Sequence, residues 1–167
     1  SIMKNSALHR AIEGSGNGGG VYITSSTSNV DVDLLSGRVI DNTSDRRGGG
    51  VCVVMPKNIN EEGKPLYVAE VVVGTNTGGP DISNNATILE GGGLYVKGAG
   101  TFEDGFNSQV EINGGKINEN STTAYVPNEN VVNEGGIVTL NGGDVPHVVV
   151  TFHGNGGLSN GQETDTQ

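Results

Sequence analysis

The chain has few aromatic residues, no tryptophan and a small hydrophobic fraction. Only 33% of its 167 residues are hydrophobic and 4% are aromatic, which is little for a conventional two-layer core. A single cysteine, Cys52, excludes an internal disulfide framework and any zinc site built on cysteines. No apolar run approaches the roughly 18 residues that a membrane-spanning helix needs. We therefore expect no membrane insertion.

Basic residues are also scarce. Nine Lys and Arg against nineteen Asp and Glu give a net charge of -10. Phosphate binding needs a basic patch, so this balance argues against nucleic acid and against an anionic membrane surface as partners. The three histidines share no metal-ligand spacing, and no phosphate loop or dinucleotide fingerprint is present. The sequence predicts neither a metal nor a cofactor.

Glycine is abundant instead, and it occurs within repeated phrases. The 29 glycines are more than twice the average share. The first phrase places an aliphatic residue three positions before an asparagine that a small residue follows. Its copies recur at intervals of roughly 35 to 43 residues, which is typical of solenoids. The asparagines of the four copies are Asn5, Asn42, Asn85 and Asn120.

Two further phrases follow the first in a constant order. The second is a glycine run before a short strand, in residues 18–23, 48–53 and 91–96, and we expect residues 124–126 to take its place in the fourth unit. The third is an alternating strand that enters a Gly-rich turn. Its copies are residues 30–37, 110–115 and 138–143, with a looser version in residues 71–79.

These phrases predict an all-β fold, a right-handed parallel β-helix (β-solenoid) of about four turns with three short strands each. The strands have period-2 alternation and no helical periodicity. An antiparallel sandwich would not explain why the same three phrases return in the same order, whereas a coil does. Equivalent residues would then stack about 4.8 Å apart along the axis.

Stacking assigns structural roles to the recurring residues. The four asparagines are expected to form a side-chain ladder in a turn, where asparagine also tolerates a left-handed backbone. Glycines in the second phrase would allow a corner too tight for a Cβ, and Cys52 would fill a stacked column rather than act as a reactive thiol. The glycines are Gly20, Gly50 and Gly93, and the column is Tyr22, Cys52, Tyr95 and Tyr125.

The repeats divide the chain into three parts. Residues 1–145 form the β-helix, and because Ile2 already belongs to a repeat phrase we expect further turns before it. Residues 146–157 break the pattern and are expected to form an exit strand that starts a following module. Residues 158–167 form a polar tail.

The glycine and asparagine phrases resemble the right-handed β-helix repeats of large cell-surface proteins from Gram-positive gut bacteria, and are similar to repeats of autotransporter-like adhesins. Residues 150–157, Val-Thr-Phe-His-Gly-Asn-Gly-Gly, resemble the first strand of a Listeria–Bacteroides repeat module. The resemblance implies a secreted, wall-attached bacterial protein. It does not fix an activity, because such helices occur in adhesins, spacers and polysaccharide-active enzymes.

Carboxylates offer one candidate catalytic site. Asp33 and Glu111 occupy the same outward strand position two turns apart, which places them roughly 10 Å from each other. Inverting glycosidases separate their carboxyl groups by about 6.5–9.5 Å. However, Val72 lies between the two, and solvated strand carboxylates explain them as well. Asp31 and Asp33 alone are too few for calcium.

Length variation offers a candidate binding site. The segments after the second-phrase strand vary most, and insertions at one phrase position of a solenoid emerge at one edge. The sequence therefore favours a non-catalytic stalk or adhesin segment that binds a glycan or a host protein through these loops. A fragment of a β-helical polysaccharide lyase or glycoside hydrolase and a spacer without ligand are the alternatives. The segments are residues 24–29, 54–68, 97–108 and 127–134, and the ligand-binding candidates are Lys57, Tyr67, Phe102, Glu103, Asp104 and Phe106.

Overall fold

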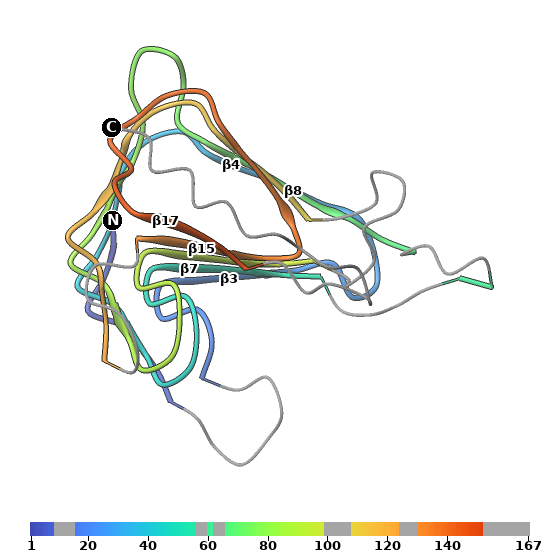
Figure 1. Cartoon of the computed structure of the whole chain (residues 1–167), viewed down its shortest axis with the longest axis horizontal. Helices are drawn as coiled ribbons and strands as arrows, with labels where there is room; N and C mark the ends of the chain where they lie inside the picture. Colours follow the sequence, from blue (N-terminus) through green and yellow to red (C-terminus); the bar gives the residue numbers. More distant parts are fainter. Residues whose placement is uncertain (9–15, 56–59, 62–65, 99–107, 124–129, 152–167) are drawn as a thin grey trace.

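The structure, a computed structural model, describes residues 1–8, 16–55, 60–61, 66–98, 108–123 and 130–151. Regular secondary structure in these ranges is entirely β, in three parallel sheets of four strands and one of five. The chain passes through the sheets in the same order on every turn, so it winds into a coil (Figure 1). The predicted right-handed parallel β-helix of about four turns is confirmed.

Each turn contains four strands rather than the predicted three. The difference arises because the first phrase forms two short strands, one on each side of its asparagine. We name the resulting sheets A and B. Sheet A contains β1 (Ile2–Met3), β5 (Arg38–Ile40), β9 (Asp81–Ser83) and β13 (Lys116–Asn118). Sheet B contains β2 (Ser6–Ala7), β6 (Thr43–Ser44), β10 (Ala86–Thr87) and β14 (Ser121–Thr122).

The second and third phrases form the two longer sheets, C and D, which enclose the core together with sheet A (Figure 1). Sheet C contains β3 (Val21–Thr24), β7 (Val51–Val54), β11 (Leu94–Lys97), β15 (Val131–Glu134) and β17 (Val148–Thr151). Sheet D contains β4 (Val30–Leu34), β8 (Ala69–Val73), β12 (Gln109–Ile112) and β16 (Ile137–Leu140).

The register turns the inward residues into aliphatic columns. In sheet C, Val51 pairs with Leu94 and Val53 with Val96, and all four side chains are fully buried. In sheet D, Val71 and Val73 join the columns of Val110 and Ile112. Towards the ends of the columns burial is lower, since the end strands have a neighbouring turn on one side: Val21 and Val138 are half-buried and Leu140 is 48% exposed. Burial of stacked β-branched residues in central turns is thus the main stabilisation of the coil.

The predicted asparagine ladder is present and has a fifth member. The side-chain Nδ2 atoms of Asn5, Asn42 and Asn85 each donate at 3.0 Å to Oδ1 of the ladder asparagine in the next turn. Asn120 continues the series by donating at 3.1 Å to Oδ1 of Asn130, a residue that the repeat pattern does not predict. Asn130 in turn donates to the Pro146 carbonyl oxygen at 2.7 Å and so ends the ladder.

The left-handed backbone lies one residue before each of the four predicted ladder asparagines, not at the asparagine itself. Lys4, Asp41, Asn84 and Glu119 have φ between 54° and 58°. The ladder side chains point into the corner and bond the backbone of the preceding turn, as Asn85 Nδ2 does to the Val39 carbonyl oxygen at 2.8 Å, while the residue before each asparagine makes the sharp bend. This corrects the expectation that the ladder asparagine adopts the strained conformation.

The glycine runs are packed too closely for side chains, as predicted. A Cβ on Gly50 would lie 2.7 Å from the Gly93 carbonyl oxygen and 2.9 Å from Asn85 Nδ2, and Gly20 and Gly93 are equally confined. Gly48 also has a φ of +64°. In the fourth turn Asn130 occupies the stacking position that Gly93 has in the third turn. Its side chain takes the place of the next ladder asparagine and accepts the hydrogen bond from Asn120.

The fourth turn differs from its prediction. Val131–Glu134, not residues 124–126, pairs with β11, so that Val132 lies beside Tyr95. Tyr125 lies outside the described residues. Val148–Thr151, predicted as an exit strand, adds β17 to the end of sheet C through pairing with β15. The sequence signal failed here because the fourth turn has no glycine run to mark the start of its strand.

Candidate functional site

Loops of unequal length leave the coil at one edge, between sheets C and D. We call this the C–D edge. The first three connections are residues 25–29, 55–68 and 98–108, whereas residues 135–136 form a two-residue link in the fourth turn. Because the strands of each sheet are stacked, the described ends of the three longer connections lie beside one another, at the narrow end of the coil in Figure 1. Of the predicted fourth loop, residues 127–134, the described part is Asn130 and the strand β15 itself, so this segment is not a connection between sheets C and D.

The bases of these loops are tied to one another by hydrogen bonds. The backbone nitrogen of Val68 donates to Asn29 Oδ1 at 3.1 Å, and Val30 donates to the Val68 carbonyl oxygen at 2.9 Å. Met55 donates to the Lys97 carbonyl oxygen at 3.0 Å, and Ser108 Oγ donates to the same oxygen at 3.2 Å. Met55 is only 2% exposed. The edge therefore presents its loops from a fixed base.

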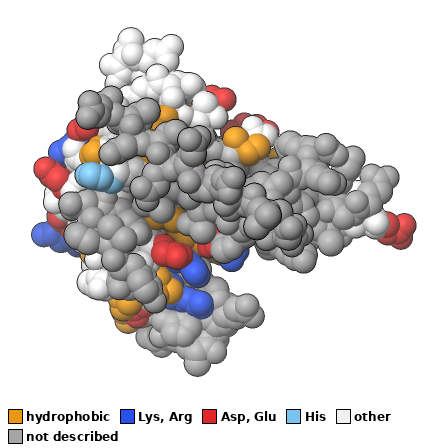
Figure 2. All heavy atoms as spheres, in the orientation of Figure 1, with side chains coloured by type: hydrophobic (Ala, Val, Ile, Leu, Met, Phe, Trp, Pro, Cys, Tyr) orange, Lys and Arg blue, Asp and Glu red, His pale blue; other side chains and the backbone are white. Residues whose placement is uncertain are grey.

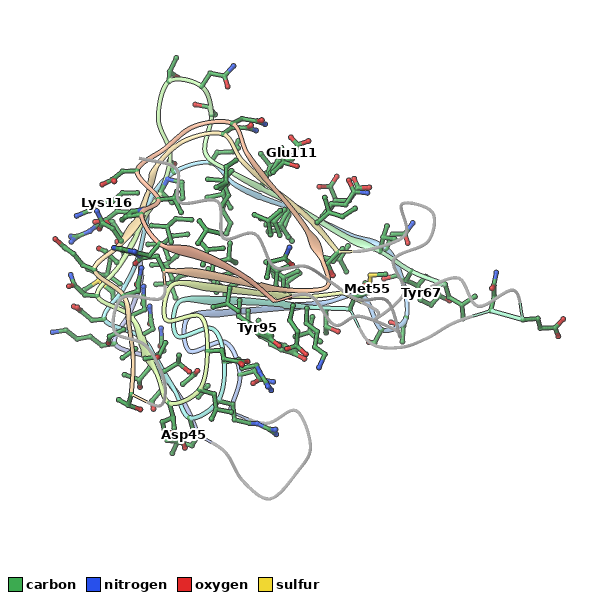
Figure 3. All side chains as sticks on the ribbon, viewed as in Figure 1. Asp45, Met55, Tyr67, Tyr95, Glu111 and Lys116 are labelled. Atoms are coloured by element: carbon green, nitrogen blue, oxygen red, sulfur yellow. The ribbon has the colours of Figure 1, made fainter. Side chains whose placement is uncertain are left out.

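Of the predicted binding residues, the structure places Tyr67. It is half-buried at the base of the second loop, next to Leu66, which is 53% exposed. Figure 3 shows both Tyr67 and Met55 at the narrow end of the coil. Sequence reasoning missed Leu66, whose only signal was an apolar residue in an otherwise polar insertion. Lys57, Phe102, Glu103, Asp104 and Phe106 lie outside the described residues.

Asp33 and Glu111 lie in the predicted column on the outward face of sheet D. Asp33 pairs with Val72, and Val72 pairs with Glu111, so two strand spacings, about 10 Å, separate the carboxylates. Figure 3 shows Glu111 pointing away from the coil. Asp31 pairs with Glu70 on the same face, which places two like charges opposite each other. Sequence reasoning did not include Glu70.

The outward face of sheet A has a different charge pattern. Arg38 pairs with Asp81, and Asp81 pairs with Lys116, so opposite charges alternate along the column. Arg38 Nε lies 3.7 Å from Asp81 Oδ2. Figure 2 shows acidic and basic side chains interspersed along this side of the molecule. This face is balanced in charge, whereas the described outward face of sheet D is acidic.

The central part of the outward face of sheet C is buried, which the sequence did not predict. Cys52, Tyr95 and Val132 form a column with exposures of 0%, 1% and 3%. Arg47 covers the Tyr95 ring, with its guanidinium carbon 5.3 Å from the ring centre. Arg47 Nε also lies 2.7 Å from Glu90 Oε2. The connections before β7 and β11 therefore fold over the sheet and form a small second core.

Ionisable groups in this second core have shifted pKa values. Burial raises the pKa of the Cys52 thiol to about 12, which the Arg47 and Lys97 charges oppose only in part. Burial and a hydrogen bond to Glu134 raise the pKa of Tyr95. Burial alone would raise the pKa of Glu134, but the Tyr95 hydrogen bond and the Lys97 and Arg47 charges outweigh it and lower that pKa. The Cys52 thiol is thus buried and protonated near neutral pH.

A shallow polar groove of about 360 Å³ lies at the corner between sheets D and A. Its walls are the connections between sheets D and A in successive turns of the coil, including the loop that projects at the top of Figure 1. Asn141 Nδ2 donates to Asn113 Oδ1 across it at 2.8 Å. The groove is lined by Thr75, Asn76, Gly78, Asn113, Gly114, Gly115, Asn141, Gly142 and Gly143.

The described residues contain neither a cluster of metal ligands nor a membrane-spanning helix. Within these ranges, no three His, Cys, Asp or Glu side chains are grouped as metal ligands. The same residues form no helix that is long and apolar enough to cross a membrane. Comparison with protein-family models, with curated proteins and with solved structures finds no match.

Proposed function

We propose that this protein is a non-catalytic module of a bacterial cell-surface protein, a stalk or adhesin segment that binds a glycan or a host protein through the C–D edge. The observation that carries the proposal is the alignment of three long connections at one edge of a regular coil. Repeat proteins commonly bind through the face where insertions of successive repeats emerge. A rigid scaffold that positions variable loops is the usual arrangement of a recognition surface.

The described part of the edge supplies apolar contact area on a fixed base. Leu66 is 53% exposed, and Tyr67 beside it is half-buried. An aromatic ring with a polar tip suits contact with sugars or proteins. Hydrogen bonds between the loop bases reduce the ordering cost of binding, since less backbone freedom is lost.

The test is binding of the purified protein to an array of mucin, host and plant glycans and to host surface proteins. For any ligand found, Leu66→Ser with Tyr67→Ser should weaken binding at least about tenfold, or roughly 1.4 kcal/mol. The matched control is Leu35→Ser, because Leu35 is 45% exposed beside the opposite corner of the coil. Circular dichroism and thermal unfolding confirm that each variant folds. An unchanged affinity in the double variant, or no ligand at all, would contradict the proposal.

The alternative is a fragment of a β-helical polysaccharide lyase or glycoside hydrolase. It is favoured by the register that aligns Asp33 with Glu111 on the outward face of sheet D. Their separation of about 10 Å slightly exceeds the spacing of inverting glycosidases. Turnover of a bound glycan that is lost in Asp33→Asn or Glu111→Gln would support this alternative over the adhesin.

A further inference from the structure

Asparagines occur in two contrasting settings in the coil. The ladder asparagines Asn42, Asn85, Asn120 and Asn130 are at most 1% exposed, and residues with side chains follow each of them. At the corner between sheets D and A, Asn113 and Asn141 are instead each followed by glycine. A following glycine leaves the backbone nitrogen sterically open to the asparagine side chain, because it has no Cβ.

Asn141 combines this sequence with exposure. Asn141, Gly142 and Gly143 are all exposed and line the corner groove, which admits water. They follow β16, the end strand of sheet D among the described strands. The Gly142 nitrogen donates to the Ile112 carbonyl oxygen at 3.2 Å, an oxygen that already accepts the Asn141 nitrogen at 2.8 Å. The Gly142 nitrogen therefore makes the longer and weaker of the two hydrogen bonds that this oxygen accepts.

We propose that Asn141 is a site of spontaneous deamidation. The Gly142 backbone nitrogen attacks Cγ of Asn141 and forms a new C–N bond, while the bond between Cγ and Nδ2 breaks and ammonia leaves with the proton from Gly142. Water then opens the cyclic imide at either carbonyl and gives aspartate or isoaspartate. The overall reaction consumes one water and converts a neutral amide into a carboxylate.

The other two described asparagine–glycine pairs should deamidate more slowly than Asn141 because of their surroundings. Gly114, which follows Asn113, is buried, and a Cβ on it would lie 2.2 Å from the Thr75 carbonyl oxygen. The nitrogen of Gly18, which follows Asn17, donates to the Arg47 carbonyl oxygen at 2.9 Å. Close packing and a stronger hydrogen bond both oppose the backbone rotation that ring closure requires. Asn141 should therefore react first of the three.

Deamidation would change both the groove and the end of sheet D. The side chain of Asn141 would lose the amide that donates to Asn113 Oδ1 at 2.8 Å and would add a negative charge to the groove. Isoaspartate also lengthens the backbone by one carbon, which disturbs the stacked turn. The modified protein should therefore open at its last sheet D strand more readily than the fresh protein.

The experiment incubates the whole protein at mildly alkaline pH and physiological temperature and follows each asparagine by tandem mass spectrometry. Aspartate and isoaspartate should accumulate at Asn141 at least about tenfold faster than at Asn85 or Asn76, a barrier difference of about 1.4 kcal/mol. Asn76 is the matched internal control because it lines the same groove, is exposed and precedes Thr77. Asn141→Gln should remove the signal at this position, since its ring closure is slower.

Three results would overturn the proposal. They are modification of Asn141 no faster than that of Asn76, earlier modification of Asn113 or Asn17 than of Asn141, and an intact Asn141 after the other asparagines of the protein have reacted. Hydrogen exchange of the fresh protein, measured in parallel, shows that the coil is folded throughout the incubation, so that a rapid signal at Asn141 reports the native corner.

Discussion

Three buried asparagines of the ladder, Asn42, Asn85 and Asn120, use their full hydrogen-bonding capacity inside the coil. Asn85 Nδ2 donates to Asn120 Oδ1 and to the Val39 carbonyl oxygen, while Asn85 Oδ1 accepts from the backbone and side-chain nitrogens of Asn42. A buried polar group that loses such a partner costs about 1–3 kcal/mol. The ladder therefore joins neighbouring turns through polar groups that have no access to water.

Replacing Asn85 with alanine should lower the free energy of unfolding by about 3–5 kcal/mol, because two buried donors of Asn42 lose their acceptor. Urea unfolding measures the change. The matched control is Asn5→Ala at the exposed end of the same ladder, which should cost less than about 1 kcal/mol. Equal losses in the two variants would contradict the role assigned to the ladder.

The residue before each of the four predicted ladder asparagines has strained backbone. Glu119 has a φ of 55°, a conformation that costs about 1–2 kcal/mol for a residue with a side chain. Glu119→Gly should raise the free energy of unfolding by about 0.5–1 kcal/mol, after the entropy that glycine loses on folding. Its ion pair with Lys116, at 3.5 Å between exposed groups, contributes little.

The neighbouring change Asn118→Gly serves as the control for Glu119→Gly. Asn118 lies in β13, outside the left-handed region, and its Nδ2 donates to Asp144 Oδ2 at 2.7 Å. This glycine should therefore destabilise the fold. Urea unfolding gives the free energy of unfolding of both variants. A loss of stability in Glu119→Gly would show that the native backbone at Glu119 is not strained.

At the scale of elements, the second core on sheet C depends on an ionised Glu134. The lowered pKa of Glu134 means that its contribution to stability is complete above its ordinary pKa of 4.5 and is lost as the pH falls through the folded value. Tyr95→Phe removes the hydrogen bond that favours the carboxylate. The stability difference between the native protein and Tyr95→Phe should be constant near neutral pH and should shrink in acid.

Tyr22→Phe is the matched control for this pH dependence. Tyr22 lies in the same column as Tyr95 but is 45% exposed at its end. Thermal unfolding across the acidic range should show that the stability difference between Tyr22→Phe and the native protein does not shrink as the pH falls. If the stabilities of Tyr95→Phe and the native protein differ by the same amount at every pH, the tyrosine does not stabilise the ionised form of Glu134.

The Cys52 thiol should be inert in the folded protein. It is fully buried beside Tyr95, and its pKa of about 12 leaves almost no thiolate near neutral pH. A thiol-specific reagent should react with it only after denaturant is added. Rapid labelling of the native protein would show that the connections covering sheet C open frequently.

For the whole molecule, the sequence was sufficient to predict the class of fold and most of the stacking. The phrases around Asn5, Asn42, Asn85 and Asn120 predict parallel coils because each copy has the same neighbours. The sequence did not predict Asn130, which enters the ladder only because the fourth turn has no glycine before its strand. A pattern of repeats shows what successive turns share and cannot reveal a residue that ends the pattern.

The buried outer face of sheet C escaped prediction for a related reason. Strand alternation predicts that Tyr95 points outward, which it does, but alternation does not tell whether a connection folds back over it. Arg47 and Glu90 lie in two different turns, and the ion pair between them depends on the path of both connections. The candidate site was predicted in part, because insertion lengths identify the C–D edge while their contacts require the structure.

The most direct test of the account is hydrogen–deuterium exchange of the protein with and without a ligand found on the glycan or protein array. Binding at the C–D edge should slow exchange at the loop bases, in residues 25–29 and 66–68, and leave the corner loop at residues 75–78 unchanged. Protection of the outward face of sheet D around Asp33 and Glu111 without any change at the C–D edge would contradict the proposal and favour the enzyme alternative.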